Sequence, residues 1–194
     1  MTTRSTESLY AIIDAGVAED PIALGRRAVT ARCAMLQLRA KRLDDRSFVD
    51  VAAELRAACR EAGIPFVVND RADIARIVHA DGLHLGQTDL RVADARRVVG
   101  SMQIGVSTHD LDQASKAQRE GADLIALGPI FETWTKEDPD PVVGLARLAE
   151  VCRRVARPVV AIGGITPENA AEAIRQGASY VAVISALPRF LGAE

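Results

Sequence analysis

Polar and apolar side chains alternate along the stretch Met35-Leu36-Gln37-Leu38-Arg39-Ala40-Lys41. Because successive side chains of a β-strand point to opposite faces, Gln37, Arg39 and Lys41 are expected to share one face. The rest of the chain alternates between strand-like and helix-like segments, which is typical of a parallel sheet covered on both sides. Two cations in a covered sheet are costly unless an anion or a carboxylate neutralises them. A guanidinium beside an ammonium suits a phosphate-bearing ligand, so the stretch predicts a polyanion-binding strand.

Eight short apolar runs rich in β-branched residues recur roughly every 25 residues, which is the size of one strand–helix unit. Amphipathic stretches separate them; the clearest begins at Thr166-Pro167, expected to be an N-cap and first helical residue, and ends at Gly177. Eight such units predict an α/β fold, a single (β/α)8 TIM barrel over residues 1–194 with a short C-terminal helix. The runs cover residues 9–14, 34–39, 66–69, 83–87, 104–107, 124–127, 159–162 and 181–185.

A doubly wound open sheet is the alternative fold, but Asp14-Ala15-Gly16 after the first run is not a GxGxxG fingerprint. The chain of 194 residues fits one domain, and its net charge of -2 gives no overall attraction to nucleic acid or to an anionic membrane. Three dispersed cysteines predict neither a disulfide framework nor a zinc site. Residues 1–8 are polar and no run is long enough to span a bilayer, so we expect a cytoplasmic protein.

The carboxyl ends of the strands form the functional face of such a barrel, so residues just after each run are candidates for binding. Asp70 closes the third run and Asp89 follows the fourth. Two carboxylates from adjacent strand ends can hold one Mg²⁺, with phosphate oxygens and water completing its octahedron. Each carboxylate could instead cap the helix that follows it, and both interpretations remain open at this point. Asp81-Gly82 precedes the fourth run and is interpreted as a structural turn.

A monophosphate site is expected where the seventh run ends in Gly163-Gly164 and the eighth in Ile184-Ser185, since many barrels bind phosphate there. The longest loop, residues 128–141, carries hydroxyls, the only Trp and Lys136, and we interpret it as a lid rather than a solvated acidic loop.

Two further polar residues belong to the middle runs. Ser107, at the end of the fifth run, is a candidate for contacting substrate, with helix capping as the alternative. His84 lies inside the fourth run and is expected to be a core residue with satisfied hydrogen bonds.

Several motifs are highly specific when taken together, and they cover nearly the whole chain. They include residues 9–14 and 37–41, Val68-Asn69-Asp70-Arg71, residues 80–89, Gly105-Val106-Ser107-Thr108-His109, Thr133-Trp134-Thr135-Lys136 and Ala161-Ile162-Gly163-Gly164-Ile165. Through these motifs the chain resembles the thiamine phosphate synthase family. The resemblance implies an Mg²⁺-dependent transferase that joins hydroxymethylpyrimidine diphosphate to a thiazole monophosphate, or to its carboxylated form. Diphosphate and thiamine monophosphate would be the products.

Matched position by position, the resemblance also implies which residues act. Ile13 and Glu132 depart from the family pattern, where Thr and Pro are common, and this affects the expected loop shape rather than the reaction. Arg39, Lys41, Ser107 and Lys136 would take part in catalysis. The pyrimidine diphosphate would be bound by Gln37, Leu38, Arg39, Ala40, Lys41, Asn69, Ser107 and Lys136, the thiazole phosphate by Thr133, Trp134, Thr135, Gly164, Ile184 and Ser185, and Mg²⁺ by Asp70 and Asp89.

Two other functions stay open. A thiazole tautomerase would keep the monophosphate site but would have no need of Arg39, Lys41 and the two carboxylates. A non-catalytic phosphate-binding barrel is the other, because a fold does not establish an activity. In each case the expected partners are small molecules, not nucleic acid or membrane, and the sequence indicates no oligomeric state.

Overall fold

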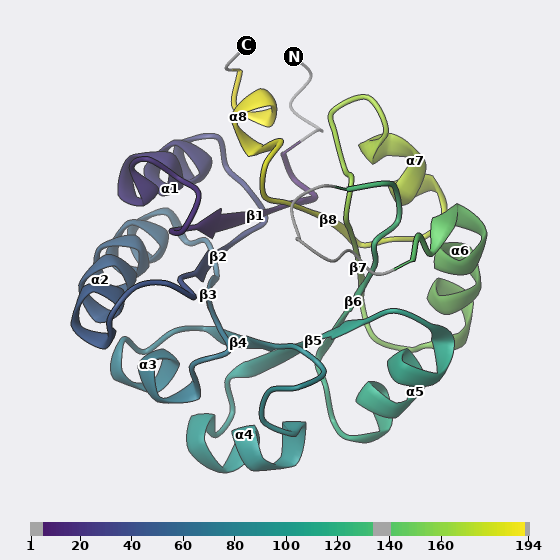
Figure 1. The fold of residues 1–194 in the computed structure, drawn as a ribbon, viewed down its shortest axis with the longest axis horizontal. Helices are drawn as coiled ribbons and strands as arrows, with labels where there is room; N and C mark the ends of the chain where they lie inside the picture. The colour runs from purple at the N-terminus through teal and green to yellow at the C-terminus, as the bar shows by residue number, and fades with distance from the viewer. Residues whose placement is uncertain (1–5, 134–140, 193–194) are drawn as a thin grey trace.

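The computed structural model describes residues 6–133 and 141–192, and within these ranges eight parallel strands close into a barrel in sequence order (Figure 1). The strands are β1 (Leu9–Asp14), β2 (Met35–Arg39), β3 (Phe66–Asn69), β4 (Gly82–Leu85), β5 (Gln103–Thr108), β6 (Leu124–Leu127), β7 (Val159–Ile162) and β8 (Tyr180–Val183). β1 pairs with both β2 and β8, which closes the ring. The predicted (β/α)8 barrel is confirmed.

A helix follows each of these strands and packs on the outside of the barrel (Figure 1). The predicted short C-terminal helix is confirmed, since the last helix has four residues. None of the described helices is long and apolar enough to cross a membrane. The helices are α1 (Pro21–Thr30), α2 (Asp45–Ala62), α3 (Ala72–Ile77), α4 (Val92–Val99), α5 (Leu111–Arg119), α6 (Gly144–Arg154), α7 (Ala170–Arg175) and α8 (Leu187–Phe190).

α2 shows how local sequence sets a helix and its buried face. The Asp44 carboxylate accepts a hydrogen bond from the backbone N of Ser47 at 3.0 Å, which satisfies one free N–H of the first turn. Phe48 and Leu55 recur at helical spacing and are buried against the barrel. Gly63 ends the helix with a φ of 69°, a left-handed conformation that glycine adopts without a Cβ clash.

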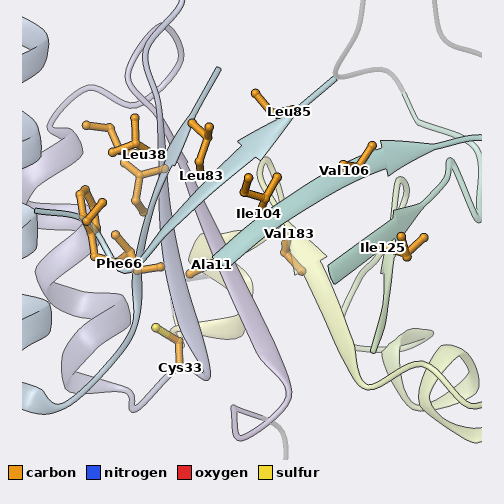
Figure 2. Packing of buried hydrophobic residues seen from close by; sticks show 14 of the residues in the cluster. Ala11, Cys33, Leu38, Phe66, Leu83, Leu85, Ile104, Val106, Ile125 and Val183 are labelled. Atoms are coloured by element: carbon orange, nitrogen blue, oxygen red, sulfur yellow. The ribbon is translucent and has the colours of Figure 1, made fainter. Parts of the chain in front are cut away.

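Strand alternation divides the core into two layers. On β1, Leu9, Ala11 and Ile13 point outward and pack under the helices, whereas Tyr10 and Ile12 point into the barrel. Each layer removes apolar side chains from water, the main favourable contribution to folding. Figure 2 shows part of the outer layer, in which neighbouring strands contribute Leu38, Phe66, Leu83, Ile104 and Ile125.

Some predicted boundaries are wrong by a few residues, and at two of them a side chain closes a turn that the apolar pattern does not indicate. β4 ends at Leu85 rather than 87, since the Asp89 carboxylate accepts the backbone N–H of Gly86 at 2.7 Å. β8 ends at Val183 rather than 185. Thr166 is not the N-cap of α7: the side chain of Asn169 accepts the Thr166 N–H at 2.8 Å, and the helix begins only at Ala170.

Asp81 has the structural role expected of it at the amino end of the barrel. Its carboxylate accepts the backbone N–H of Phe66 at 2.8 Å and forms an ion pair with Arg56 of α2 at 3.0 Å. One side chain thus joins the starts of β3 and β4 to the helix between β2 and β3. Asp81 therefore lies at the opposite end of the strands from the candidate site.

Candidate active site

A cavity of about 630 Å³ lies at the carboxyl ends of the strands. Its lining includes Arg39 of β2, Ser107 of β5, and residues of the loops after β6, β7 and β8. The structure thus brings six predicted binding residues into one cavity: Arg39, Ser107, Thr133, Gly164, Ile184 and Ser185. Trp134, Thr135 and Lys136 lie outside the described residues.

Arg39 enters the barrel mouth already paired with a carboxylate. Asp14, which stands beside it in the register of β1 and β2, accepts a hydrogen bond from its guanidinium. The other Asp14 oxygen accepts the backbone N–H of Gly16 at 2.9 Å, so the carboxylate is held from two sides. This partner offsets the cost of placing a guanidinium in the barrel and leaves part of Arg39 facing the cavity.

Sequence reasoning missed Asp14 as a site residue. The available signal was its position as the last residue of the first run, one strand away from the polar face of β2.

Lys41, Asp70 and Asp89 form a second charged group beside this mouth. Because β2 ends at Arg39, Lys41 follows the strand, and its Nζ lies 3.3 Å from an oxygen of Asp70. Burial raises the pKa of the Asp70 carboxyl above its usual value, and the neighbouring Asp89 carboxylate raises it further, with Lys41 acting in the opposite direction. Two like charges held together in this way favour a cation between them.

The alternative that these two carboxylates cap helices is wrong. α3 begins at Ala72 and α4 at Val92, and neither helix has a side-chain cap. Asp70 instead has a φ of 62°, and Asp89 closes the turn at Gly86. Across the described residues, no group of three or more His, Cys, Asp or Glu side chains gathers into a closed cage. Two carboxylates alone fit a Mg²⁺ ion that keeps water and phosphate oxygens as its other ligands.

A directed chain of hydrogen bonds crosses the barrel interior below the mouth. The Tyr10 hydroxyl donates to Oε1 of Gln37 at 2.7 Å, and Nε2 of Gln37 donates to Oδ1 of Asn69 at 3.1 Å. All three side chains are buried, and burial raises the pKa of Tyr10 above its usual value, so the phenol stays protonated. This chain of hydrogen bonds fixes the orientation of the Asn69 amide, because its Oδ1 accepts the bond from Gln37. The pattern of β2 indicated Gln37, whereas Tyr10 reads as an ordinary core aromatic.

His84 and Ser107 meet across β4 and β5. Nε2 of His84 lies 2.9 Å from Oγ of Ser107, and the side chain of Gln87 donates to the main-chain oxygen of Ser107 at 2.5 Å. Burial lowers the pKa of His84 to about 4, while Asp89 acts in the opposite direction. The expectation that His84 is fully satisfied is wrong, because its buried Nδ1 has no hydrogen-bond partner among the described residues.

Leu38 and Ala40 do not present side chains to the cavity. Both pack in the layer between strands and helices, so any contact with a substrate comes from their main chain. The same strand alternation that turns Gln37 and Arg39 inward turns these two outward.

The start of the loop after β6 is fixed against the loop after β7. Backbone N–H groups of Ile130 and Phe131 donate to the oxygens of Ile162 and Gly163 at 2.9 and 3.0 Å. Gly164 has a φ of 64°, and a Cβ there would lie 2.3 Å from the main-chain oxygen of Glu132. Glycine is therefore required at 164 for the close approach of the two loops.

Comparison with known proteins agrees with this arrangement. The family model for thiamine monophosphate synthase matches residues 9–187. The chain is 44% identical to a thiamine-phosphate synthase of Chloroflexus aurantiacus over 92% of its own length and 84% of that relative. It is also 44% identical to a thiamine-phosphate synthase of Methanocella arvoryzae, covering 92% and 86% of the two chains.

Solved structures show the same relationship. The thiamine phosphate pyrophosphorylase from Pyrococcus furiosus superimposes with a TM-score of 0.86 at 33% identity, over 97% of this chain and 90% of that one. An N-acetylmannosamine-6-phosphate 2-epimerase from Clostridium perfringens reaches 0.72 at 15% identity, over 96% and 93% of the chains, and shares the fold alone. The family model matches most of the chain, both relatives are covered over most of their length, and the Pyrococcus furiosus structure superimposes closely. The chain therefore belongs to the thiamine monophosphate synthase family.

Proposed function

We propose that this chain joins hydroxymethylpyrimidine diphosphate to a thiazole monophosphate, forming thiamine monophosphate and releasing diphosphate. One observation carries the proposal. A single cavity is lined on one side by Arg39 and Ser107, and on the other by Gly164, Ile184 and Ser185. The first side offers a cation and a hydroxyl donor for a diphosphate, and the second offers the strand ends where barrels of this type bind a monophosphate.

The residues on the diphosphate side neutralise charge. Arg39 and Lys41 face the growing negative charge of the departing diphosphate, and Ser107 donates a hydrogen bond to one of its oxygens. Lys136, by its matching position, would add a third cation. We assign Asp70 and Asp89 to a Mg²⁺ ion, which when bound would offset further charge on the leaving group.

The buried amides position the pyrimidine. The Tyr10–Gln37–Asn69 chain holds the Asn69 amide in one orientation below the cavity. An electron-rich aminopyrimidine stabilises the methylene cation left when diphosphate departs, so the reaction needs no strong protein base. Catalysis then consists of charge neutralisation and of holding the thiazole nitrogen close to that carbon.

The charged group beside the mouth favours condensation over thiazole tautomerisation. A tautomerase acting on a thiazole phosphate would use the β7 and β8 side only. It would have no use for the adjacent Asp70 and Asp89 carboxylates, whose mutual repulsion Lys41 offsets only in part.

The test is a direct product assay. The purified chain is mixed with hydroxymethylpyrimidine diphosphate, thiazole monophosphate and Mg²⁺, and thiamine monophosphate and diphosphate are quantified by mass spectrometry. We expect equal amounts of the two products. Arg39→Ala is the matched variant and should lower the rate about 100-fold or more. Binding of both substrates without product would contradict the proposal and favour a phosphate-binding barrel, and isomerisation of a thiazole phosphate without condensation would favour a tautomerase.

A further inference from the structure

His84 is a buried histidine in direct contact with a proposed substrate-binding hydroxyl. The residue is 7% exposed, and its Nε2 is 2.9 Å from Oγ of Ser107. Ser107 itself lines the cavity. The direction of this hydrogen bond decides whether the Ser107 proton is used within the protein or offered to a substrate.

The surroundings of Nδ1 decide that direction. Nδ1 is buried, and within the described part of the chain it has no hydrogen-bond partner. A Cβ built on Gly105 would lie 2.6 Å from Nδ1, so the hydrogen that Gly105 carries in its place points at this nitrogen. An N–H at Nδ1 would be a buried donor facing a C–H group, whereas a bare nitrogen can receive that C–H as a weak contact.

A bare Nδ1 places the single ring proton of the neutral imidazole on Nε2. The Nε2–H then donates to Oγ of Ser107, and Oγ uses a lone pair to accept it. The hydroxyl hydrogen of Ser107 is left for another acceptor. A doubly protonated ring would also bury an N–H at Nδ1 without a partner, so the geometry excludes this form. The neutral ring protonated at Nε2 keeps the hydrogen bond to Ser107 and avoids that buried donor.

β4 and the turn that follows it hold Ser107 at two atoms. The side chain of Gln87, in the turn after β4, donates to the main-chain oxygen of Ser107 at 2.5 Å. With the ring proton on Nε2, His84 of β4 donates to the Ser107 side chain, so both the backbone position and the hydroxyl direction are fixed. Gly105 is needed for this arrangement, because any larger residue would push the His84 ring away from Ser107.

We propose that His84 is a positioning residue, which donates from Nε2 to Ser107 and thereby makes the Ser107 hydroxyl an obligatory donor to an oxygen of the diphosphate-bearing substrate. The assignment of that oxygen rests on the proposed function, whereas the direction of the His84–Ser107 bond does not. The hydroxyl would select an acceptor that lacks its own proton, such as an ionised phosphate oxygen.

Nitrogen-15 NMR of the labelled, ligand-free protein tests the bond direction without any activity. We expect His84 Nε2 to resonate as a protonated nitrogen and Nδ1 as a bare one, with the signals assigned by their loss in His84→Gln. The exposed His79 serves as the control, through His79→Asn, which should leave both His84 signals unchanged. Protonation of Nδ1, alone or together with Nε2, would overturn the proposal.

Kinetics test the consequence for the substrate. His84→Leu, which removes the donor, should lower kcat/KM for the pyrimidine diphosphate about 10- to 100-fold and leave the KM for thiazole phosphate within about twofold. His84→Gln retains an N–H near the position of Nε2 and should recover most of the loss. In a Ser107→Ala background the His84→Leu change should have little further effect, because its action passes through Ser107.

Fully additive losses in that double variant, or equal losses in His84→Leu and His84→Gln, would contradict the positioning role. If the wild type makes no thiamine monophosphate, the proposed function fails on its own. The NMR measurement, together with binding of inorganic diphosphate and Mg²⁺ to the wild type and to His84→Leu, then still decides the role of His84. Equal diphosphate affinity in His84→Leu and the wild type would overturn it.

Discussion

Individual charged residues of the mouth are each held by a neighbour before any substrate arrives. Arg39 is paired with Asp14, and Lys41 with Asp70. The alternation of β2 correctly indicated that Gln37 and Arg39 turn inward, whereas Lys41, predicted on the same strand face, lies after the end of the strand. The alternation does not say which residues neutralise the two cations. A carboxylate from the adjacent strand was one of two possibilities, and the register of β1 with β2 realises it.

Asp89→Asn tests the assignment of the metal. The asparagine oxygen can still accept the Gly86 N–H and keep the turn, while the charge next to Asp70 is lost. We expect turnover at limiting Mg²⁺ to fall about 10- to 100-fold, with a higher Mg²⁺ concentration needed for half-maximal rate. Mg²⁺ titration of activity measures this, and the exposed Asp94→Asn is the control. An unchanged titration in Asp89→Asn would show that this carboxylate is not a ligand.

Ser185→Phe tests the monophosphate side. Ser185 lines the cavity just after β8, so a bulky side chain there should obstruct the phosphate of the thiazole and leave intact the diphosphate side at Arg39, which belongs to β2. We expect the KM for thiazole phosphate to rise about tenfold or more, and the KM for pyrimidine diphosphate to change less than threefold. Steady-state kinetics with each substrate varied in turn provide the measurement. Equal effects on both constants would mean that the two anions are not separated as we describe.

Helices and strands were predictable from the sequence where burial alone defines them. Their ends were not predictable where a single side chain terminates the element. The run at 66–69 reproduces β3 because all four residues are buried. The end of β4 was missed because the Asp89–Gly86 bond lies outside the apolar pattern. Thr166-Pro167 has the composition of a helix start, yet Asn169 forms a turn there first. Periodicity reports burial, whereas these ends depend on single hydrogen bonds.

The amino ends of the strands are joined to helices by aspartates, and Asp123 repeats the arrangement of Asp81. Its carboxylate accepts the N–H of Ile104 at 2.9 Å and pairs with Arg96 of α4 at 2.7 Å. Burial works to raise the pKa of Asp123, but these two partners outweigh it and the pKa lies below its usual value. A lowered pKa means that the ionised form stabilises the fold above the unfolded pKa of about 3.9 and loses this effect as pH falls.

Asp123→Asn should therefore destabilise the protein by about 1 kcal/mol at pH 7, a modest value because both partners are partly exposed. Near pH 3 the difference from the wild type should shrink, since the wild-type carboxyl becomes protonated as well. Urea unfolding at the two pH values measures this, with the exposed Asp50→Asn as the control. A difference of the same size at both pH values would contradict the ionic role of Asp123.

For the molecule as a whole, the sequence predicted a barrel and the ring of strand ends at which its candidate site lies. What it could not supply were relations between residues of different strands: the Asp14–Arg39 pair, the Tyr10–Gln37–Asn69 chain and the orphaned nitrogen of His84. These contacts depend on the register between strands, which decides which inward-facing side chains lie at the same level of the barrel. Only the closed sheet determines that register.

The central claim at this scale is that one mouth holds two anions side by side, a diphosphate near Arg39 and a monophosphate near Ser185. Isothermal titration calorimetry tests it most directly, with inorganic diphosphate and Mg²⁺ titrated first and thiazole monophosphate second into the same sample. We predict one equivalent of each, bound at the same time, with neither displacing the other. Competition between the two anions for a single site would contradict the account.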